Sequence, residues 1–352
     1  MCFAAGLSLP AVADDVRPLE ARWLEISEFL RDQRQAENIP GLSAALVADG
    51  KLAWLGAFGM ADVENDVPAT PQTVYRIGPI TRMFTAVAVL QLVQSGRVGL
   101  HQSIRDYVPE FPDKGATINL RHLLAHLSGI RGFRLSEESL NRKRYSRMVD
   151  TVELFKNDPL RARPGERFLN SSLAYDLLGV MIERVGGDKY EAFLRRHIFE
   201  PAGMTATAIE DAEAIVPRRA RGYRRTPGGT LRHSPFVDVS ISVPADGLVS
   251  TAEDLARFAI AFQSHTILSA EFIQVMTTVH KTNSGSDEQY GLGCFVRQES
   301  GLTIVGHGGW MPQVSAFLLI VPERRAAVVI LANLERVDVA AMSVRVMKML
   351  LE

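Results

Sequence analysis

Hydrophobic and polar residues along the first sixty positions follow patterns that predict one helix and then two paired strands. Residues 15–38 carry apolar side chains at helical spacing, and the stripe comprises Trp23, Ile26, Phe29 and Leu30. The segments 42–49 and 52–60 are rich in strand-forming residues, and the Asp49-Gly50 dipeptide between them is typical of a tight hairpin turn. We therefore expect a terminal helix packed on an antiparallel sheet.

Residues 75–95 form the segment around which we expect the fold to be organised. Their pattern predicts a strand end, a Gly78-Pro79 turn and a helix over 80–95 that is apolar on nearly all sides, as in a protein core. Pro79 suits the first helical turn, where its missing N–H is not needed. Because a helix begins with unpaired N–H groups and the positive end of its dipole, this position suits a nucleophile or an anion.

The rest of the chain continues with helical and then β-rich patterns. Ser171 and Ser172 are expected to cap the helix at 173–185. Thr251 is expected to cap a helix that begins directly after residue 251. The predicted helices lie at 117–129, closed by Gly129, at 173–185 and at 337–351. The predicted strands lie at 290–297, 302–306, 314–321 and 325–332.

Composition limits the classes of function. The chain has 352 residues and 47% hydrophobic content, which suits a globular protein with a large core. Its net charge of −1 gives no overall positive electrostatic field that would attract nucleic acid. No run approaches the roughly 18 apolar residues of a membrane span, so we expect no transmembrane segment. Cys2 and Cys294 have no metal-binding spacing, and neither a metal nor a cofactor is predicted. His122 and His126 lie at i, i+4 without the Glu of a zinc motif, so we expect structural roles for them.

Two stretches concentrate arginine. Residues 131–147 hold six basic residues against Glu137 and Glu138, and residues 218–232 hold six arginines and no acid. Solvated loop surface is the ordinary interpretation of such runs, and a basic rim for an anionic ligand is the alternative.

The first thirteen residues, MCFAAGLSLPAVA, match the end of an export signal, with an apolar stretch and an A-x-A site before Asp14-Asp15. We expect a periplasmic or secreted protein. The alternative is an irregular N-terminus of a cytoplasmic protein.

Several segments, in order between residues 40 and 333, resemble motifs of the serine β-lactamase and penicillin-binding-protein superfamily, in its class C and esterase branch. Residues 76–86 resemble the S-x-x-K segment. Residues 123–129 resemble "LLxHxSG", and residues 197–205 resemble "IFxPLGM". Residues 164–179 resemble P-G-x-x-F-x-Y-S-N with its helix, and residues 244–258 resemble "GGLxSTAxDLxxF". Gly306-His307-Gly308-Gly309, which we place between two strands, matches the H-x-G form of the K-T-G strand.

The resemblance implies roles for particular positions, and the residues found there depart from the pattern. The nucleophilic Ser is replaced by Pro79 and the Lys by Arg82, which stays protonated. Asn170 stands at the Tyr position and Ser172 at the Asn position. Asp246 replaces the first Gly of its motif. His307 and Gly309 are intact, and the resemblance implies that this strand lines the cleft and offers an oxyanion N–H.

These substitutions lead to three hypotheses. The first is a non-catalytic binding or regulatory protein, a pseudoenzyme, whose interlobe cleft holds a small, peptide-like or ester-like ligand, anionic if Arg82, His307, Gly308 and Gly309 bind it. The second is an active hydrolase, esterase or transferase with a relocated nucleophile, for which the hydroxyl candidates are Thr81, Ser171, Ser172 and Ser128. The third is a non-hydrolytic enzyme that uses His307 or Asp246 for proton transfer. The oligomeric state is not indicated.

The resemblance also implies a mixed α/β (α+β) fold of the β-lactamase/transpeptidase type. We expect an antiparallel sheet flanked by terminal helices, with a mainly helical lobe inserted between its strands. The expected sheet lobe covers about residues 14–75 and 235–352, and the helical lobe about 76–234, after the signal remnant at 1–13.

Overall fold

The computed structural model describes residues 19–134 and 137–352, so the expected export signal lies outside the described residues. The helices are α1 (Leu19–Ala36), α2 (Thr81–Gln94), α3 (Leu120–Leu124), α4 (Met148–Val152), α5 (Ser172–Gly186), α6 (Tyr190–Leu194), α7 (Glu200–Ala202), α8 (Val243–Asp246), α9 (Ala252–Gln263), α10 (Ala270–Met276) and α11 (Val339–Leu351). A short 3-10 segment, η1 (Gly78–Ile80), leads into α2.

The main sheet has seven antiparallel strands in the order β3-β2-β1-β12-β11-β10-β9. These strands are β1 (Gly41–Ala48), β2 (Lys51–Asp62), β3 (Val67–Pro68), β9 (Phe295–Glu299), β10 (Leu302–Met311), β11 (Val314–Val321) and β12 (Ala326–Ala332). Smaller sheets contain β4 (Tyr75–Arg76), β5 (Ala208–Ile209) and β8 (Leu248–Ser250), and β6 (Tyr223–Arg225) with β7 (Leu231–His233). The predicted mixed fold with an antiparallel sheet is confirmed.

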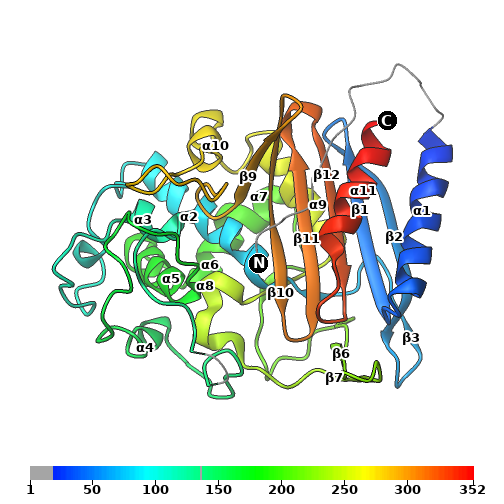
Figure 1. Cartoon of the computed structure of the whole chain (residues 1–352), viewed down its shortest axis with the longest axis horizontal. Helices are drawn as coiled ribbons and strands as arrows, with labels where there is room; N and C mark the ends of the chain where they lie inside the picture. The colour runs from blue at the N-terminus through cyan, green and yellow to red at the C-terminus, as the bar shows by residue number, and fades with distance from the viewer. Residues whose placement is uncertain (1–18, 135–136) are drawn as a thin grey trace.

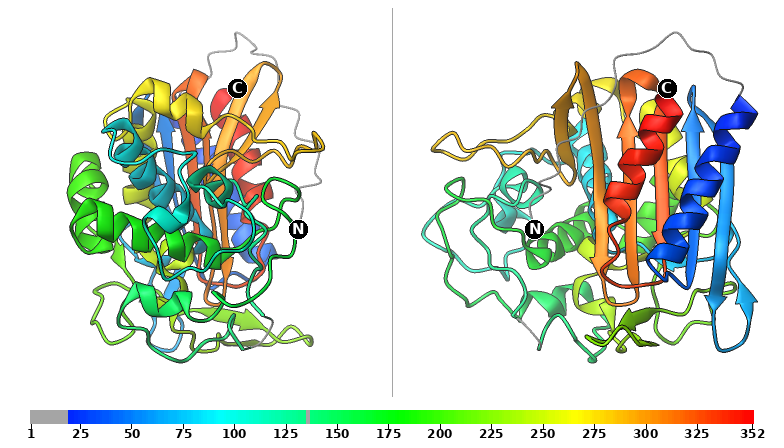
Figure 2. Two further views of the ribbon diagram at one scale, coloured as in Figure 1. Left: turned by 90° about the vertical axis from the view of Figure 1, so that its left-hand side faces the viewer. Right: turned by 45° about the vertical axis from the view of Figure 1, so that its right-hand side comes forward.

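Both faces of the central strands are buried, which explains why β1 reads as a nearly continuous apolar run. Leu42 and Leu46 point to one core, which α1 and α11 cover, whereas Ala45 and Val47 point to a second core shared with α2, α5 and α9. Figure 1 shows α1 and α11 side by side over one face, and both cross in front of the strands in the right view of Figure 2.

The helical part gathers beside the β9 edge of the sheet, with α2 passing through its middle (Figure 1). Helix α2 packs against α5 and α8, and η1 packs against β10. Nearly every side chain of α2 is buried, as predicted from its lack of a polar face. The head of this helix therefore lies where the helical part meets the sheet.

Several predicted boundaries were wrong. The helix expected at 117–129 covers only Leu120–Leu124, because the chain turns into left-handed conformations at His126 and Gly129. The strand expected from residue 290 begins at Phe295. Gly306–Gly309 lies inside β10 rather than between two strands. Ser171 caps α5 through its side chain as predicted, whereas Ser172 is the first helical residue and not a cap.

No helix in residues 19–134 and 137–352 combines the length and the apolar character needed to cross a bilayer.

Candidate functional site

The start of α2 lies directly against strand β10. Pro79 is the central residue of η1, and the residue before it, Gly78, has a φ of 50°. A Cβ added at Gly309 would lie 2.0 Å from the carbonyl oxygen of Ile77, so the two backbones touch and only glycine fits there. The structure thus brings together the positions of the first and third motifs, Pro79 and His307–Gly309, across one backbone contact.

Replacing Gly309 by Ala should lower the free energy of unfolding by roughly 1–3 kcal/mol, because the new methyl group must push the Ile77 carbonyl and β10 apart. Gly308→Ala is the matched control, since its Cβ would meet only ring atoms of Phe317 at 3.4 Å or more. Urea unfolding of both variants measures the difference. Equal stability of the two would contradict the predicted close approach.

Arg82 occupies the interior of the site and is 3% exposed. One terminal nitrogen donates to Asn170 Oδ1 at 2.9 Å and faces His126 Nε2 at 3.2 Å. The other donates to Ser172 Oγ at 3.0 Å and lies 3.7 Å from a carboxylate oxygen of Asp246. Of its nitrogens, Nε alone has no hydrogen-bond partner among the residues that the structure describes. The guanidinium therefore fills the space between the substituted motif positions and joins them.

Asp246 comes to this site from the last residue of α8, far along the chain from Arg82. Burial raises the pKa of its carboxyl group, while the Arg82 charge and a hydrogen bond from Ser172 act in the opposite direction. A glycine, expected here from the motif, would leave Arg82 without this counter-charge. Asp246 is thus the acidic partner of Arg82 in the described part of the chain.

His126 is fully buried beneath Arg82 and holds a φ of 58°, which is unusual for a residue other than glycine. Its Nδ1 accepts from the backbone N–H of Ser171 at 3.2 Å, and its Nε2 faces Arg82. A neutral imidazole has one lone pair to offer, so it accepts fully from only one of these donors. Burial and the Arg82 charge hold the pKa of His126 well below its usual range, which keeps the ring uncharged.

His307 is held in one tautomer by its two neighbours. Its Nδ1 donates to the Gly308 carbonyl at 2.8 Å, so Nε2 accepts from the Tyr290 hydroxyl at 3.0 Å. Burial, aided by the Arg82 charge, lowers the pKa of His307 to about 3. His307 is therefore neutral at physiological pH and offers no positive charge to an anion.

Tyr290 is a site residue that the sequence analysis missed, because it was assigned to a predicted strand. Its ring packs against His126 and Phe168, and burial raises the pKa of its hydroxyl. Gly293, three residues later, has a φ of 76° and passes so close to α2 that a Cβ would lie 2.7 Å from the Arg82 carbonyl. The Gly-Leu-Gly sequence after Tyr290 was the available signal for this approach.

The candidate relocated nucleophiles are engaged in structural contacts. Thr81 is fully buried, and its hydroxyl accepts from the backbone N–H of Leu248. The Ser171 hydroxyl donates to the Arg131 carbonyl at 2.6 Å and caps α5. Ser128 is 1% exposed and accepts from the backbone of Ile130. Ser172 differs, because its hydroxyl lies between a guanidinium and a carboxylate.

A cavity of about 520 Å³ has Asn170 in its lining. Its lining comprises Arg131, Gly132, Phe133, Arg134, Arg161, Leu169 and Asn170. The first arginine-rich stretch thus contributes two side chains to a cavity. Arg144 and Arg147 of the same stretch instead form ion pairs with Asp211 and Asp150.

The second arginine-rich stretch, residues 218–232, lines neither this cavity nor Arg82's surroundings. Arg219, Arg221 and Arg225 form ion pairs, and their acidic partners are Glu210, Glu64 and Glu37. Three of the six arginines in this stretch therefore take part in ion pairs rather than forming a rim around a ligand.

The two histidines of the i, i+4 pair have separate structural partners. His122 Nδ1 faces the backbone N–H of Asn119 at 3.4 Å as part of a capping box, whereas His126 faces Ser171 and Arg82. Within the two described ranges, no three His, Cys, Asp or Glu side chains gather as a metal site.

The comparisons with known proteins agree with the fold and with the family that the sequence resembles. A model of the Beta-lactamase family matches residues 26–347. Protein flp of Staphylococcus aureus (strain NCTC 8325 / PS 47) is 29% identical over 320 residues, which cover 88% of this chain and 63% of that protein. Serine beta-lactamase-like protein LACTB, mitochondrial, of Homo sapiens is 30% identical over 310 residues, which cover 68% of this chain and 56% of that protein. The chain therefore spans less than two thirds of the length of these relatives.

Two solved structures superpose closely. The octameric penicillin-binding protein homologue from Pyrococcus abyssi has a TM-score of 0.82 and 28% identity, and the match covers 94% of this chain and 77% of that one. The D-amino acid amidase from Ochrobactrum anthropi SV3, in complex with L-phenylalanine amide, has a TM-score of 0.82 and 26% identity, with 94% and 98% covered. From the family match over most of its length and from these structures, this chain belongs to the Beta-lactamase family of penicillin-binding-protein-like serine hydrolases.

Proposed function

We propose that this member of the family has lost the acyl-serine mechanism and acts as a non-catalytic binding or regulatory protein. The observation that carries the proposal is the set of contacts around the buried Arg82, which joins Asn170, Ser172 and Asp246 into one network. Acyl transfer needs a nucleophile and a base that can take its proton. Pro79 has no hydroxyl, and neither Arg82 nor Asn170 can take a proton near neutral pH.

The backbone of β10 supports the proposal from the other direction. Its contact with η1 keeps the first and third motif segments adjacent, and the neutral His307 is held between the Tyr290 hydroxyl and the Gly308 carbonyl. A site that keeps its shape but lacks its reacting groups suits ligand recognition rather than turnover. Whether Arg82 itself contacts a ligand stays a prediction, because its terminal nitrogens already face protein partners.

The proposal predicts that the purified protein forms no covalent adduct with a fluorescent penicillin or a fluorophosphonate and does not hydrolyse a short p-nitrophenyl ester. Intact-mass spectrometry and absorbance measure the two outcomes. An active-site serine hydrolase of this family, assayed in parallel, provides the positive control. A mass increase that maps to a single hydroxyl would show that the chemistry had moved rather than disappeared.

The alternative is an active hydrolase with Ser172 as its nucleophile. The Ser172 hydroxyl lies beside Asp246, and the pKa of the Asp246 carboxyl group is raised. In that mechanism Asp246 would take the hydroxyl proton while Oγ attacks an acyl carbon, and would then return the proton to the leaving group. Adduct formation that Ser172→Ala abolishes and Ser171→Ala leaves intact would favour this alternative. A non-hydrolytic reaction through His307 or Asp246 would instead show turnover without any adduct.

We further propose, from the sequence of residues 1–13, that the protein is exported. Fractionation of cells that express the full chain tests this, and recovery in the cytoplasmic fraction at full length would contradict it.

A further inference from the structure

The cavity beside Asn170 is built by two chain segments that pack tightly onto each other. The backbone N–H of Arg161 donates to the Gly129 carbonyl at 2.8 Å, and a Cβ at Gly129 would lie 2.0 Å from the Ala162 carbonyl. A Cβ at Gly132 would lie 3.0 Å from the Asn170 carbonyl. The walls are therefore set by backbone contacts, and a ligand would meet a preformed site.

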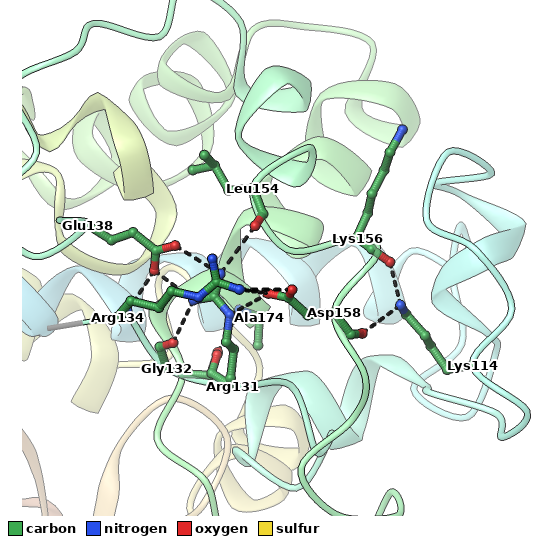
Figure 3. A network of polar contacts seen from close by, with 10 residues as sticks. Lys114, Arg131, Gly132, Arg134, Glu138, Leu154, Lys156, Asp158 and Ala174 are labelled. Carbon is green, nitrogen blue, oxygen red and sulfur yellow. Dashed lines mark hydrogen bonds and ion pairs between the residues drawn. The ribbon is translucent and has the colours of Figure 1, made fainter.

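Arg131 forms the base of this site and has no hydrogen to spare. Its guanidinium donates to Glu138 twice, to Asp158, and to the carbonyls of Gly132 and Leu154 (Figure 3). The two carboxylates have further partners of their own. Asp158 also accepts from the Arg134 guanidinium, and Glu138 also accepts from the Arg134 backbone N–H. Arg131 is thus a structural cation with two anionic partners.

The remaining charges leave an excess of positive charge at the cavity. Arg131, Arg134 and Arg161 line it, whereas the nearby carboxylates are Glu138 and Asp158, which pair with Arg131 and Arg134. Among residues 19–134 and 137–352, the Arg161 guanidinium has no hydrogen bond or ion pair, and the Arg134 guanidinium donates through one of its three nitrogens. These two side chains are exposed and can turn their free N–H groups toward a bound anion.

Asn170 adds a third donor, because its orientation is fixed from behind. Arg82 donates to the Asn170 oxygen, so the amide nitrogen, with two N–H groups, is the end left for the cavity. The apolar part of the wall comes from Phe133 and Leu169. A volume of about 520 Å³ lies in the range of sites for small organic ligands.

We propose that this cavity binds a carboxylate with an apolar body, of the size of an N-acylated amino acid, with the carboxylate held by Arg161, Arg134 and the Asn170 amide and the apolar part against Phe133 and Leu169. The inference deepens the proposed binding function by naming the ligand class and its donors. It differs from an anion site at Arg82, whose terminal nitrogens are already directed at protein atoms.

Calorimetric titration with N-acetylphenylalanine and with its uncharged amide tests the proposal on the full chain. The acid should bind at least about 10-fold more tightly than the amide, because only the acid pairs with both guanidinium groups. Arg161→Gln and Arg134→Gln should each weaken binding of the acid by about 5-fold to 10-fold or more and leave the amide unaffected. Equal affinity of acid and amide, or no binding of either at millimolar concentration, would overturn the proposal.

Arg163→Gln is the matched control, because it removes an exposed arginine of the same loop that does not line the cavity. It should leave binding unchanged, and a loss as large as that of Arg161→Gln would show a general charge effect and overturn the site. Asn170→Asp replaces two donors by a carboxylate and should abolish binding of the acid. Thermal melting of each variant reports whether it is folded.

The outcome is separable from that of the proposed function. Acylation of a hydroxyl together with arginine-dependent binding of the acid would refute loss of catalysis and leave this site standing. Absence of acylation together with equal binding of acid and amide would refute this site and leave the loss of catalysis standing.

Discussion

Replacing Arg82 by Met should cost about 3–5 kcal/mol of unfolding free energy, the largest effect that we expect from a single substitution in this protein. The methionine can fill much of the space, but it leaves the Asp246 carboxylate without its cation and the Asn170 and Ser172 side chains without their donor. Unfolding in urea, monitored by circular dichroism, measures the loss. Arg257→Met is the control, since this exposed arginine pairs with Glu253 on the surface of α9 and should cost at most about 1 kcal/mol.

The pH dependence identifies the group responsible. Without Arg82 the folded-state pKa of Asp246 rises further, so the folded protein retains a proton that the unfolded chain has released. Stability then falls as pH increases, and the deficit of Arg82→Met should be larger at pH 8 than at pH 5. Adding Asp246→Asn should recover part of the loss and remove this dependence. A deficit under about 1 kcal/mol at both pH values would contradict a central role for Arg82.

Replacing Asp176 by Asn should make the protein more stable at pH 8. Asp176 is fully buried in α5, and neither of its carboxylate oxygens has a hydrogen-bond partner in the described part of the chain. The nearby hydroxyls of Thr151 and Ser242 act to lower the pKa of this carboxyl group, whereas burial and the neighbouring Asp246 act to raise it. Burial therefore raises the pKa of Asp176 well above its usual range, and the side chain folds in its protonated form.

The sign follows from proton linkage. The unfolded chain releases this proton near pH 4 while the folded protein retains it, so the wild-type protein loses up to about 1.4 kcal/mol per pH unit above that point. Asparagine has nothing to titrate, and the advantage of Asp176→Asn should grow from pH 5 to pH 8 and shrink toward pH 4. Melting temperatures across this range provide the measurement. Asp66→Asn, in an exposed turn, should show the wild-type dependence; a constant difference for Asp176→Asn would exclude a buried acid.

The elements that the sequence predicted well are those whose signal is local. Strands β1 and β2 with their Asp49-Gly50 turn, the apolar helix α2 and the closing helix α11 each carry their periodicity or turn residues within one short segment. Boundaries failed where backbone conformation was decided by packing. Helix α3 ends early because the chain at His126 turns back to place the imidazole between Ser171 and Arg82.

The same distinction holds for the site. The departures at Pro79, Arg82, Asn170 and Ser172 were visible from the motifs alone. The structure shows that Asn170 and Ser172 both accept hydrogen bonds from the Arg82 guanidinium. Asp246 could be noted as an odd residue, but its role as the counter-charge of Arg82 depends on α8 packing against α2 and α5. Tyr290 could not be recognised as a site residue from the sequence, because it lies in none of the motifs and was assigned to a predicted strand.

By itself the sequence determined that this chain has the fold of its family, and it placed Pro79 and Arg82 where the motif has Ser and Lys, because both follow from which side chains occupy short, ordered motifs. Only the tertiary structure decided which side chains surround those positions. Buried charges need partners, and which partner is within reach depends on contacts between segments more than a hundred residues apart, as for Arg82 and Asp246. Likewise, Arg131 occupies the Glu138 and Asp158 carboxylates, so Arg134 and Arg161 keep N–H groups that these acids do not bind. Which donors stay available therefore depends on the packing of several segments.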